Sequence, residues 1–312
     1  MRFLVVGAGA LGGYFGGRLL EAGRDVTFLL RERRAAQLMQ TGLQIRSAFG
    51  DLHLPEPPHV LSEQIDSPFD VVVVACKAYD LEATMDSFAL AVGPDTAILP
   101  LLNGMQHLDK LSERFGADKV LGGLCMISAT LDVHGTVLHL NDLHDLHYGE
   151  LDGSMSPRVQ AINEAFSGAN FASRASEIIL QEMWEKWVFI ATAAGITSLM
   201  RGSVGDIVAA GAGSLTIALL EECAAIATLS GFEPRAKALE RARTVLTTAG
   251  SPMTASMAKD IERGAQVESD QLIDDMIRRA PERHEGLSLL RVVQAHLGAY
   301  QARRAREQAG AK

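Results

Sequence analysis

The chain has 312 residues, of which 47% are hydrophobic and 21% charged, so it can bury the cores of about two ordinary domains. Its formal net charge of −9 argues against a nucleic-acid partner, because Lys and Arg are not in excess to neutralise phosphates. Its three cysteines are scattered, which argues against a disulfide framework, and its apolar runs are shorter than the roughly 18 residues of a membrane span, so we expect a cytoplasmic protein.

The first twelve residues carry the most informative motif. Residues 3–6 form a short apolar run that predicts a strand, and a helical pattern from about residue 10 continues to Glu21. Between them lies a G-x-G-x-x-G turn, made of Gly7, Ala8, Gly9, Ala10, Leu11 and Gly12. This arrangement holds the pyrophosphate of a dinucleotide, since backbone N–H groups and the positive end of the helix dipole face the anion. We therefore expect these six residues to contact a dinucleotide cofactor.

Strand and helix signals alternate through the first half of the chain. Residues 71–76 form a wholly apolar run rich in valine, which is typical of a parallel strand covered on both faces. Further strands are predicted over residues 25–30, 96–102 and 120–126, followed by an antiparallel pair over residues 136–140 and 145–149. The alternation predicts an α/β fold with an N-terminal, Rossmann-like, doubly wound sheet.

The second half has helical rather than strand periodicity. Helices are predicted from about residue 178 to Met200, and then over residues 214–230, 234–246, 256–264, 267–279 and 286–305. We therefore expect two domains, a dinucleotide-binding domain over residues 1–174 and an all-helical domain over residues 175–312. A crevice between such domains is the expected place for a ligand.

Arg31 bears on the choice of nicotinamide cofactor, because it directly follows the second predicted strand. A carboxylate at this place accepts hydrogen bonds from the ribose hydroxyls of NAD, whereas a guanidinium suits the 2′-phosphate of NADP. Arg31 therefore favours NADP. Glu32 keeps NAD open, since it would serve the NAD role if the strand ended one residue later.

Several polar residues are candidates for chemistry. Lys77 and Asn103 follow two predicted parallel strands, and the carboxyl ends of such strands line a ligand crevice, although either could be an ordinary loop residue. Lys186 lies between two tryptophans, where partial desolvation favours proton donation, but from the pattern alone a lysine that reaches water is the commoner outcome. Ser256 and Glu268 could bind a hydroxy acid or lie on an exposed helix surface.

In their order along nearly the whole chain, these motifs resemble the ketopantoate reductases (2-dehydropantoate 2-reductases). The resemblance implies that NADPH reduces the 2-oxo group of ketopantoate to give pantoate, in pantothenate and coenzyme A biosynthesis. It also implies that Lys186 is the general acid and that Glu268 is a substrate-binding carboxylate near it. Ser256 would contact the substrate carboxylate, and Lys77 and Asn103 would line the nicotinamide end. A homodimer is compatible with the resemblance, but the sequence does not define the oligomeric state.

The chain departs from the family four and eight residues after the lysine. The family typically has asparagine at both places, whereas this chain has Ile190 and Ala194, and Val204 stands in place of a third asparagine. Residues 186, 190 and 194 share one helix face, so a polar substrate group there would lose about 1–3 kcal/mol for each missing partner. Thr197 lies near that face and is expected to bind substrate and compensate in part. A 2-oxo acid with a less polar tail therefore remains an alternative substrate.

Two further alternatives stay open. A β-hydroxyacid dehydrogenase also combines this cofactor fold with a helical domain and a catalytic lysine, but Ile190 stands where that class normally has asparagine. A redox-sensing regulator that binds NADP without turnover would need the glycine turn, yet it would have no use for Lys186 with Glu268. No metal site is expected, because the histidines at 134, 139, 144 and 147 lack accompanying cysteines or paired acids.

Overall fold

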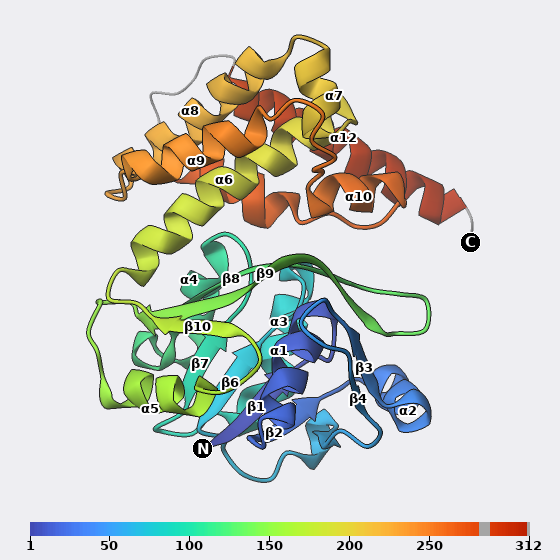
Figure 1. Ribbon diagram of the computed structural model, residues 1–312, viewed down its shortest axis with the longest axis vertical. Helices are drawn as coiled ribbons and strands as arrows, with labels where there is room; N and C mark the ends of the chain where they lie inside the picture. The colour runs from blue at the N-terminus through green and yellow to red at the C-terminus, as the bar shows by residue number, and fades with distance from the viewer. Residues whose placement is uncertain (281–287, 311–312) are drawn as a thin grey trace. The chain divides into compact units, whose positions relative to one another are not determined.

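The computed structural model describes residues 1–280 and 288–310, which form two compact units (Figure 1). Unit 1 consists of Met1–Leu102 and His107–Ile179, and unit 2 consists of Asn103–Gln106 and Leu180–Lys312. The predicted helix from 286 begins outside the described residues. Within residues 1–280 and 288–310, no helix is both long and apolar enough to cross a membrane.

Unit 1 contains the parallel sheet that the sequence predicts. Its strand order is β5-β2-β1-β6-β7, and every neighbouring pair is parallel. The strands are β1 (Arg2–Val6), β2 (Asp25–Leu29), β5 (His59–Val60), β6 (Val71–Val74) and β7 (Ala97–Pro100). The helices of unit 1 are α1 (Ala10–Glu21), α2 (Glu32–Thr41), α3 (Leu81–Phe88), α4 (Gln106–Phe115) and α5 (Pro157–Phe166). The first residue of α4 belongs to unit 2, and α6 begins at the last residue of unit 1. The prediction of an α/β fold with a doubly wound sheet is confirmed.

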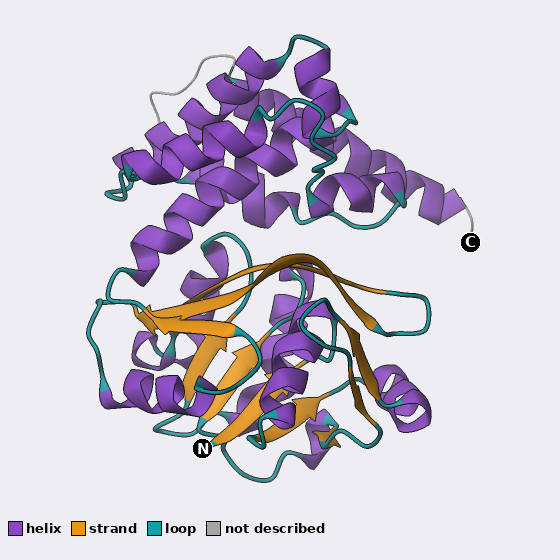
Figure 2. Ribbon diagram, in the orientation of Figure 1, coloured by secondary structure: helices purple, strands orange, loops and turns teal. Residues whose placement is uncertain are grey.

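A second sheet, drawn with the first in orange in Figure 2, was not predicted as such. Its order is β10-β9-β3-β4, and β8 pairs with β9 off this path. The strands are β3 (Leu43–Arg46), β4 (Leu52–Leu54), β8 (Leu121–Leu131), β9 (Val137–Glu150) and β10 (Ala172–Ala175). Short 3₁₀ helices complete unit 1, namely η1 (Ser62–Gln64), η2 (Ala78–Asp80), η3 (Ala89–Ala91) and η4 (Ala117–Lys119).

The predicted antiparallel pair over residues 136–140 and 145–149 is wrong. Residues 137–140 and 145–149 both belong to the single strand β9, whose antiparallel partner is β8. The polar residues between them suggest a turn, but Asn141 stays in the strand because its Oδ1 accepts the backbone N–H of Ser128 at 2.8 Å. A shift of register between Ile127 and Ala129 absorbs the irregularity.

Helix α1 packs between the two sheets because glycines face both of them. A Cβ at Gly16 would lie 2.7 Å from the ring of Phe28 in β2, and a Cβ at Gly17 would lie 2.8 Å from Ile45 in β3. Both glycines are buried. The absence of side chains therefore lets the helix approach both layers closely, which fixes its N-terminus beside the end of β1.

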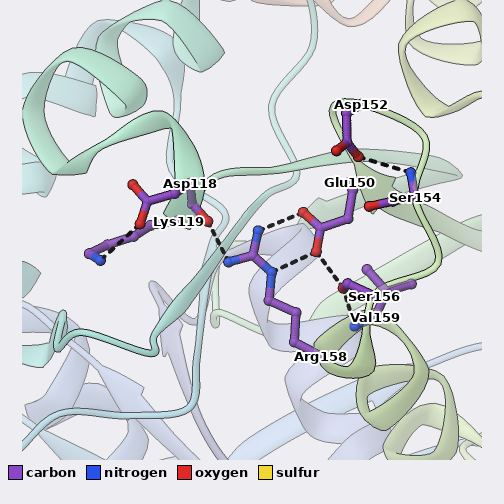
Figure 3. Close-up of polar contacts among 8 residues, drawn as sticks. All are labelled: Asp118, Lys119, Glu150, Asp152, Ser154, Ser156, Arg158 and Val159. Atoms are coloured by element: carbon purple, nitrogen blue, oxygen red, sulfur yellow. Dashed lines mark hydrogen bonds and ion pairs between the residues drawn. The ribbon is translucent and has the colours of Figure 1, made fainter.

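A buried carboxylate attaches α5 to the end of β9 (Figure 3). Glu150 accepts hydrogen bonds from Arg158 Nε at 2.7 Å and from Ser156 Oγ at 2.5 Å. Ser156 is also the N-cap of α5, where its hydroxyl accepts the N–H of Val159. The guanidinium of Arg158 reaches further to the carbonyl oxygen of Asp118. This network joins three segments of unit 1 and has a structural role.

Unit 2 is helical in the part that the structure describes, as predicted. Its helices are α6 (Ile179–Met200), α7 (Val204–Ala209), α8 (Gly213–Leu229), α9 (Ala236–Leu246), α10 (Ser256–Glu262), α11 (Asp275–Arg278) and α12 (Leu289–Gly310). Two predicted helices differ. Helix α9 begins at Ala236 with Arg235 as its N-cap, so Pro234 precedes it. The regular helix predicted over residues 267–279 is replaced by a π-helical turn, η5 (Asp270–Asp274), which continues into α11.

Candidate active site

The glycine turn has the geometry that a dinucleotide requires. Gly7 has a φ of +92°, which other residues rarely adopt, and a Cβ at Gly12 would collide with the carbonyl oxygen of Gly7. Gly9 is the N-cap of α1, and a Cβ built on it would meet nothing within 4 Å. The turn is therefore tight at its base and leaves open space beside Gly9, where the backbone can approach an anion.

The N-terminus of α1 is suited to a phosphate. No side chain caps this end of the helix, and its first turn contains no acidic residue. The first backbone N–H groups of a helix lack intrahelical partners and carry the positive end of the dipole. Residues 7–12 therefore fit the pyrophosphate of a dinucleotide, and this fit rests on the turn itself.

Arg34 supports the glycine turn through a hydrogen bond to its backbone. The sequence did not predict this role. Its Nε donates to the carbonyl oxygen of Ala8 at 3.0 Å, and its Nη2 donates to the carbonyl oxygen of Gly135 at 3.0 Å. Burial lowers the pKa of the Arg34 guanidinium. The only sequence signal was its place three residues after Arg31. Arg34 thus connects the turn to the loop between β8 and β9.

Arg31 and Glu32 both lie just beyond β2, which ends at Leu29. Arg31 is the N-cap of α2 and Glu32 is its first residue. The side chain of Arg31 is 73% exposed, and its Nη2 lies 3.4 Å from a carboxylate oxygen of Asp80. This exposed ion pair contributes little stability, so the guanidinium can exchange its partner for a more highly charged one.

Lys77 and Asn103 follow neighbouring strands, but they belong to different units. Lys77 precedes η2 as its N-cap, three residues after the end of β6. Asn103 follows β7 by three residues and starts the short segment that belongs to unit 2. There its carbonyl oxygen accepts the side-chain N–H of Gln271 at 2.8 Å.

Lys186, Ile190 and Ala194 lie on helix α6 at intervals of four residues and so share one face. Thr197 lies one turn further along and is fully buried. Its hydroxyl donates to the carbonyl oxygen of Ala193 at 2.6 Å and accepts the N–H of Ala255 at 3.4 Å. The hydroxyl therefore already has two partners within unit 2.

Thr197 helps to position Ser256. Ala255 is the N-cap of α10 and Ser256 is the first residue of that helix, so the contact with Thr197 holds the start of α10 against α6. Ser256 is exposed, and Asp260 follows it by one turn on the same helix.

Glu268 lies two residues before the π-helical turn η5. Its carbonyl oxygen accepts the N–H of Leu272 at 3.1 Å, and the carbonyl oxygen of Leu272 in turn accepts the indole N–H of Trp187 at 3.0 Å. Trp187 is fully buried and follows Lys186 directly. One chain of hydrogen bonds thus connects the segment of Glu268 with the segment of Lys186.

Glu185, which precedes Lys186 in the sequence, forms an ion pair with Arg235. The Oε1 atom accepts Nε at 2.7 Å, and Oε2 accepts Nη2 at 2.6 Å. Burial opposes ionisation of Glu185, but the hydrogen bonds from Arg235 outweigh it and keep the pKa of this carboxyl below its ordinary value. Within the described residues, no cluster of His, Cys, Asp and Glu side chains is suited to a metal ion.

Comparisons with known proteins agree with these features. The model of the family described as ketopantoate reductase PanE/ApbA matches residues 3–153, and the model of its C-terminal domain matches residues 178–301. The uncharacterised oxidoreductase YkpB of Bacillus subtilis (strain 168) is 38% identical over 97% of this chain and 99% of its own. The 2-dehydropantoate 2-reductase of Nostoc sp. is 25% identical over 90% of this chain and 89% of its own.

A solved structure agrees over nearly the whole length. The 2-dehydropantoate 2-reductase of Geobacter metallireducens GS-15 has a TM-score of 0.86 at 26% identity, and the match covers 96% of this chain and 99% of that one. The resemblance inferred from the sequence is thereby confirmed. The chain belongs to the ketopantoate reductase family of oxidoreductases, which act on CH–OH groups.

Proposed function

We propose that this protein reduces a 2-oxo acid to a 2-hydroxy acid with NADPH, and that ketopantoate is the first substrate to test. The observation that carries the proposal is a dinucleotide-type glycine turn in a chain that also has Lys186 and Glu268 on connected segments. NADPH supplies the hydride that adds to C2 of the substrate. The balanced reaction consumes one 2-oxo acid, one NADPH and one proton, and it yields the 2-hydroxy acid and NADP⁺.

Lys186 is proposed as the general acid. Negative charge develops on the carbonyl oxygen as C2 is reduced, and an ammonium group both stabilises that charge and transfers a proton to the oxygen. Glu268 is proposed to accept a hydrogen bond from the substrate and to keep positive charge on Lys186. The match of the family's C-terminal model to residues 178–301, a range that contains Lys186, Ser256 and Glu268, supports these roles.

The remaining residues are proposed to bind the cofactor and the substrate and to orient them. Gly7–Gly12 would hold the pyrophosphate, and Arg31 would bind the 2′-phosphate that distinguishes NADP from NAD. Lys77 and Asn103 would contact the nicotinamide end and the substrate. Ser256 would contact the substrate carboxylate at the start of α10.

A second candidate substrate, a 2-oxo acid with a less polar tail, is favoured by the face of α6. Ile190 and Ala194 offer no hydrogen-bonding side chain there. Thr197 cannot readily replace the missing amides, because its hydroxyl already bonds to Ala193 and Ala255. Loss of NADPH absorbance with ketopantoate and with unbranched 2-oxo acids of similar length would decide between the two substrates by their kcat/KM values.

Replacing Lys186 tests the chemistry. In Lys186→Ala we expect kcat to fall by about 10²–10⁴-fold, with the Kd for NADPH within twofold of wild type. Unchanged turnover would contradict the assigned role. A regulator that senses NADPH without turnover would show cofactor binding and no consumption of any 2-oxo acid in the wild-type protein, and membership of a family of oxidoreductases argues against it.

A further inference from the structure

The π-helical turn η5 lies next to three of the proposed site residues in unit 2. Asp275 N–H donates to the carbonyl oxygen of Asp270, five residues earlier, so the backbone is wider here than in an α-helix. Such single π-turns are rare and occur frequently at functional sites. The turn begins two residues after Glu268.

Gln271 in this turn holds the segment of Asn103. Its Nε2 donates to the carbonyl oxygen of Asn103 at 2.8 Å, and the side chain is nearly fully buried. Gly104 has a φ of +81°, and a Cβ there would lie 2.7 Å from the carbonyl oxygen of Gln271. The amide of Gln106, oriented to satisfy its neighbours, donates to Oε1 of Gln271 at 3.2 Å and accepts from Arg278 at 2.8 Å. Residues 103–106 therefore pack closely against Gln271 and form hydrogen bonds with it.

Trp187 holds the segment of Lys186 to the same turn. Its indole N–H donates to the carbonyl oxygen of Leu272, the residue that follows Gln271. Its ring packs at 4.9 Å from the ring of Trp184 and lies 5.8 Å from the guanidinium of Arg279. Breaking this hydrogen bond would deprive the carbonyl oxygen of Leu272 of the indole donor, which is costly in a buried place.

We propose that η5 is the element that aligns Asn103, Lys186 and Glu268 with one another, and that Gln271 and Trp187 are positioning residues for the reaction. This inference rests on the proposed function. Asn103 and Lys186 are separated by more than 80 residues. Yet Asn103 is one hydrogen bond from Gln271, and Lys186 is joined to the adjacent Leu272 through its neighbour Trp187 and one hydrogen bond. A small displacement of the turn would move all three site residues together, and a misplacement of about 1 Å can cost 100-fold in rate.

The test compares Gln271, which belongs to η5, with Gln294, which binds η5 from α12. Gln271→Leu removes the contact to Asn103. Gln294→Leu is the matched control, because Gln294 of α12 donates to Asp274 Oδ1 at 3.0 Å and touches no proposed site segment through that bond. We expect Gln271→Leu to lower kcat by about 10- to 100-fold with little change in the Kd for NADPH. Gln294→Leu should change kcat less than about threefold, even if both variants lose similar thermal stability.

The second pair of variants tests the hydrogen bond that the indole N–H of Trp187 donates. Trp187→Phe keeps a ring but removes the donor, and Trp184→Phe is its control on the same helix. Trp187→Phe should lower kcat and shift the pH at which kcat falls, whereas Trp184→Phe should do neither. Because Trp187 and Gln271 act through one turn, the double variant should lose less than the product of the two single losses. Equal effects within either pair would overturn the proposal.

Hydrogen exchange gives a readout that does not depend on turnover. In Gln271→Leu, the backbone amides of residues 103–106 should exchange about tenfold faster or more, while Gln294→Leu leaves them unchanged. If the wild-type protein reduces no 2-oxo acid, the proposed function fails, but this coupling is still measured. Unchanged exchange in Gln271→Leu would contradict the positioning role by itself.

Discussion

The guanidinium of Arg34 donates through Nε to the carbonyl oxygen of Ala8 at 3.0 Å, so a side chain from α2 fixes the backbone of the glycine turn. The same guanidinium donates to Gly135 and to Gln37. Its two backbone contacts therefore connect segments more than 100 residues apart in sequence. This connection leads to a prediction about cofactor binding by a residue that need not touch the cofactor.

Arg34→Met should weaken NADPH binding. The substitution keeps the apolar stem but removes the donors that hold Ala8 and Gly135, so the turn loses its preformed shape. We expect the Kd for NADPH to rise about tenfold, from the loss of roughly 1–1.5 kcal/mol of hydrogen bonding. Titration of intrinsic fluorescence with NADPH measures the effect. Arg33→Met, in an exposed neighbour on the same helix, is the control and should bind NADPH as wild type does.

Arg31→Ala should change the choice of cofactor. The exposed guanidinium pairs with Asp80 at 3.4 Å, and a 2′-phosphate would be a stronger partner than one carboxylate. We expect KM for NADPH to rise about tenfold while KM for NADH changes less than twofold, since only NADPH carries the 2′-phosphate. Initial rates with each cofactor measure both values.

Asp80→Asn provides the complementary test of cofactor choice. Removing the carboxylate leaves Arg31 in place and takes away its competing partner, so NADPH should bind slightly more tightly. If Arg31→Ala affected NADPH and NADH equally, Arg31 would not read the 2′-phosphate, and Glu32 would become the residue to test for NAD.

The parts of the fold set by local sequence were predictable, and the parts set by distant pairing were not. The glycines of α1 predict close packing of that helix, and the valines of β6 predict a strand buried on both faces. Both predictions depend only on residues that are neighbours in the sequence. Strand β9 was split in two because Asn141 resembles a turn residue, and only its bond to Ser128 on β8 shows otherwise.

The candidate site was predictable in part for the same reason. Lys186 and Glu268 stood out by residue type and by the order of family motifs. Gln271 gave no signal, because its role depends on a loop that lies more than 160 residues earlier in the chain. The π-helical turn itself has no pattern in sequence that separates it from an ordinary helix, and its width becomes visible only in the backbone hydrogen bonds.

Ile190→Asn should shift substrate preference toward ketopantoate. The amide would face the same side of α6 as Lys186 and could hydrogen-bond a substrate hydroxyl that Ile190 leaves unpaired. We expect the ratio of kcat/KM for ketopantoate to that for an unbranched 2-oxo acid to rise about tenfold. Ile190→Leu keeps the side chain apolar and should leave the ratio near that of wild type. Equal ratios in the two variants would show that residue 190 does not face the substrate.

The ion pair between Glu185 and Arg235 should make stability depend on pH. Hydrogen bonds from Arg235 hold the pKa of Glu185 below its ordinary value despite burial, so the folded protein binds this proton less readily than the unfolded chain. The stabilisation is therefore fully present above the unfolded pKa of about 4.3 and is lost as the pH falls through the lower pKa of the folded state.

Urea unfolding of Glu185→Gln tests this dependence. At pH 7 the variant should be less stable than wild type by about 1–3 kcal/mol, because Glu185 is only 9% exposed and its bonds to Arg235 are charge-assisted. The difference should narrow as the pH is lowered below 4.3 or so, where wild-type Glu185 also takes up a proton. Glu262→Gln is the control, since its pair with Arg201 is exposed on both sides and should contribute much less. A difference that stayed constant from neutral to acidic pH would mean that Glu185 acts through packing rather than through its charge.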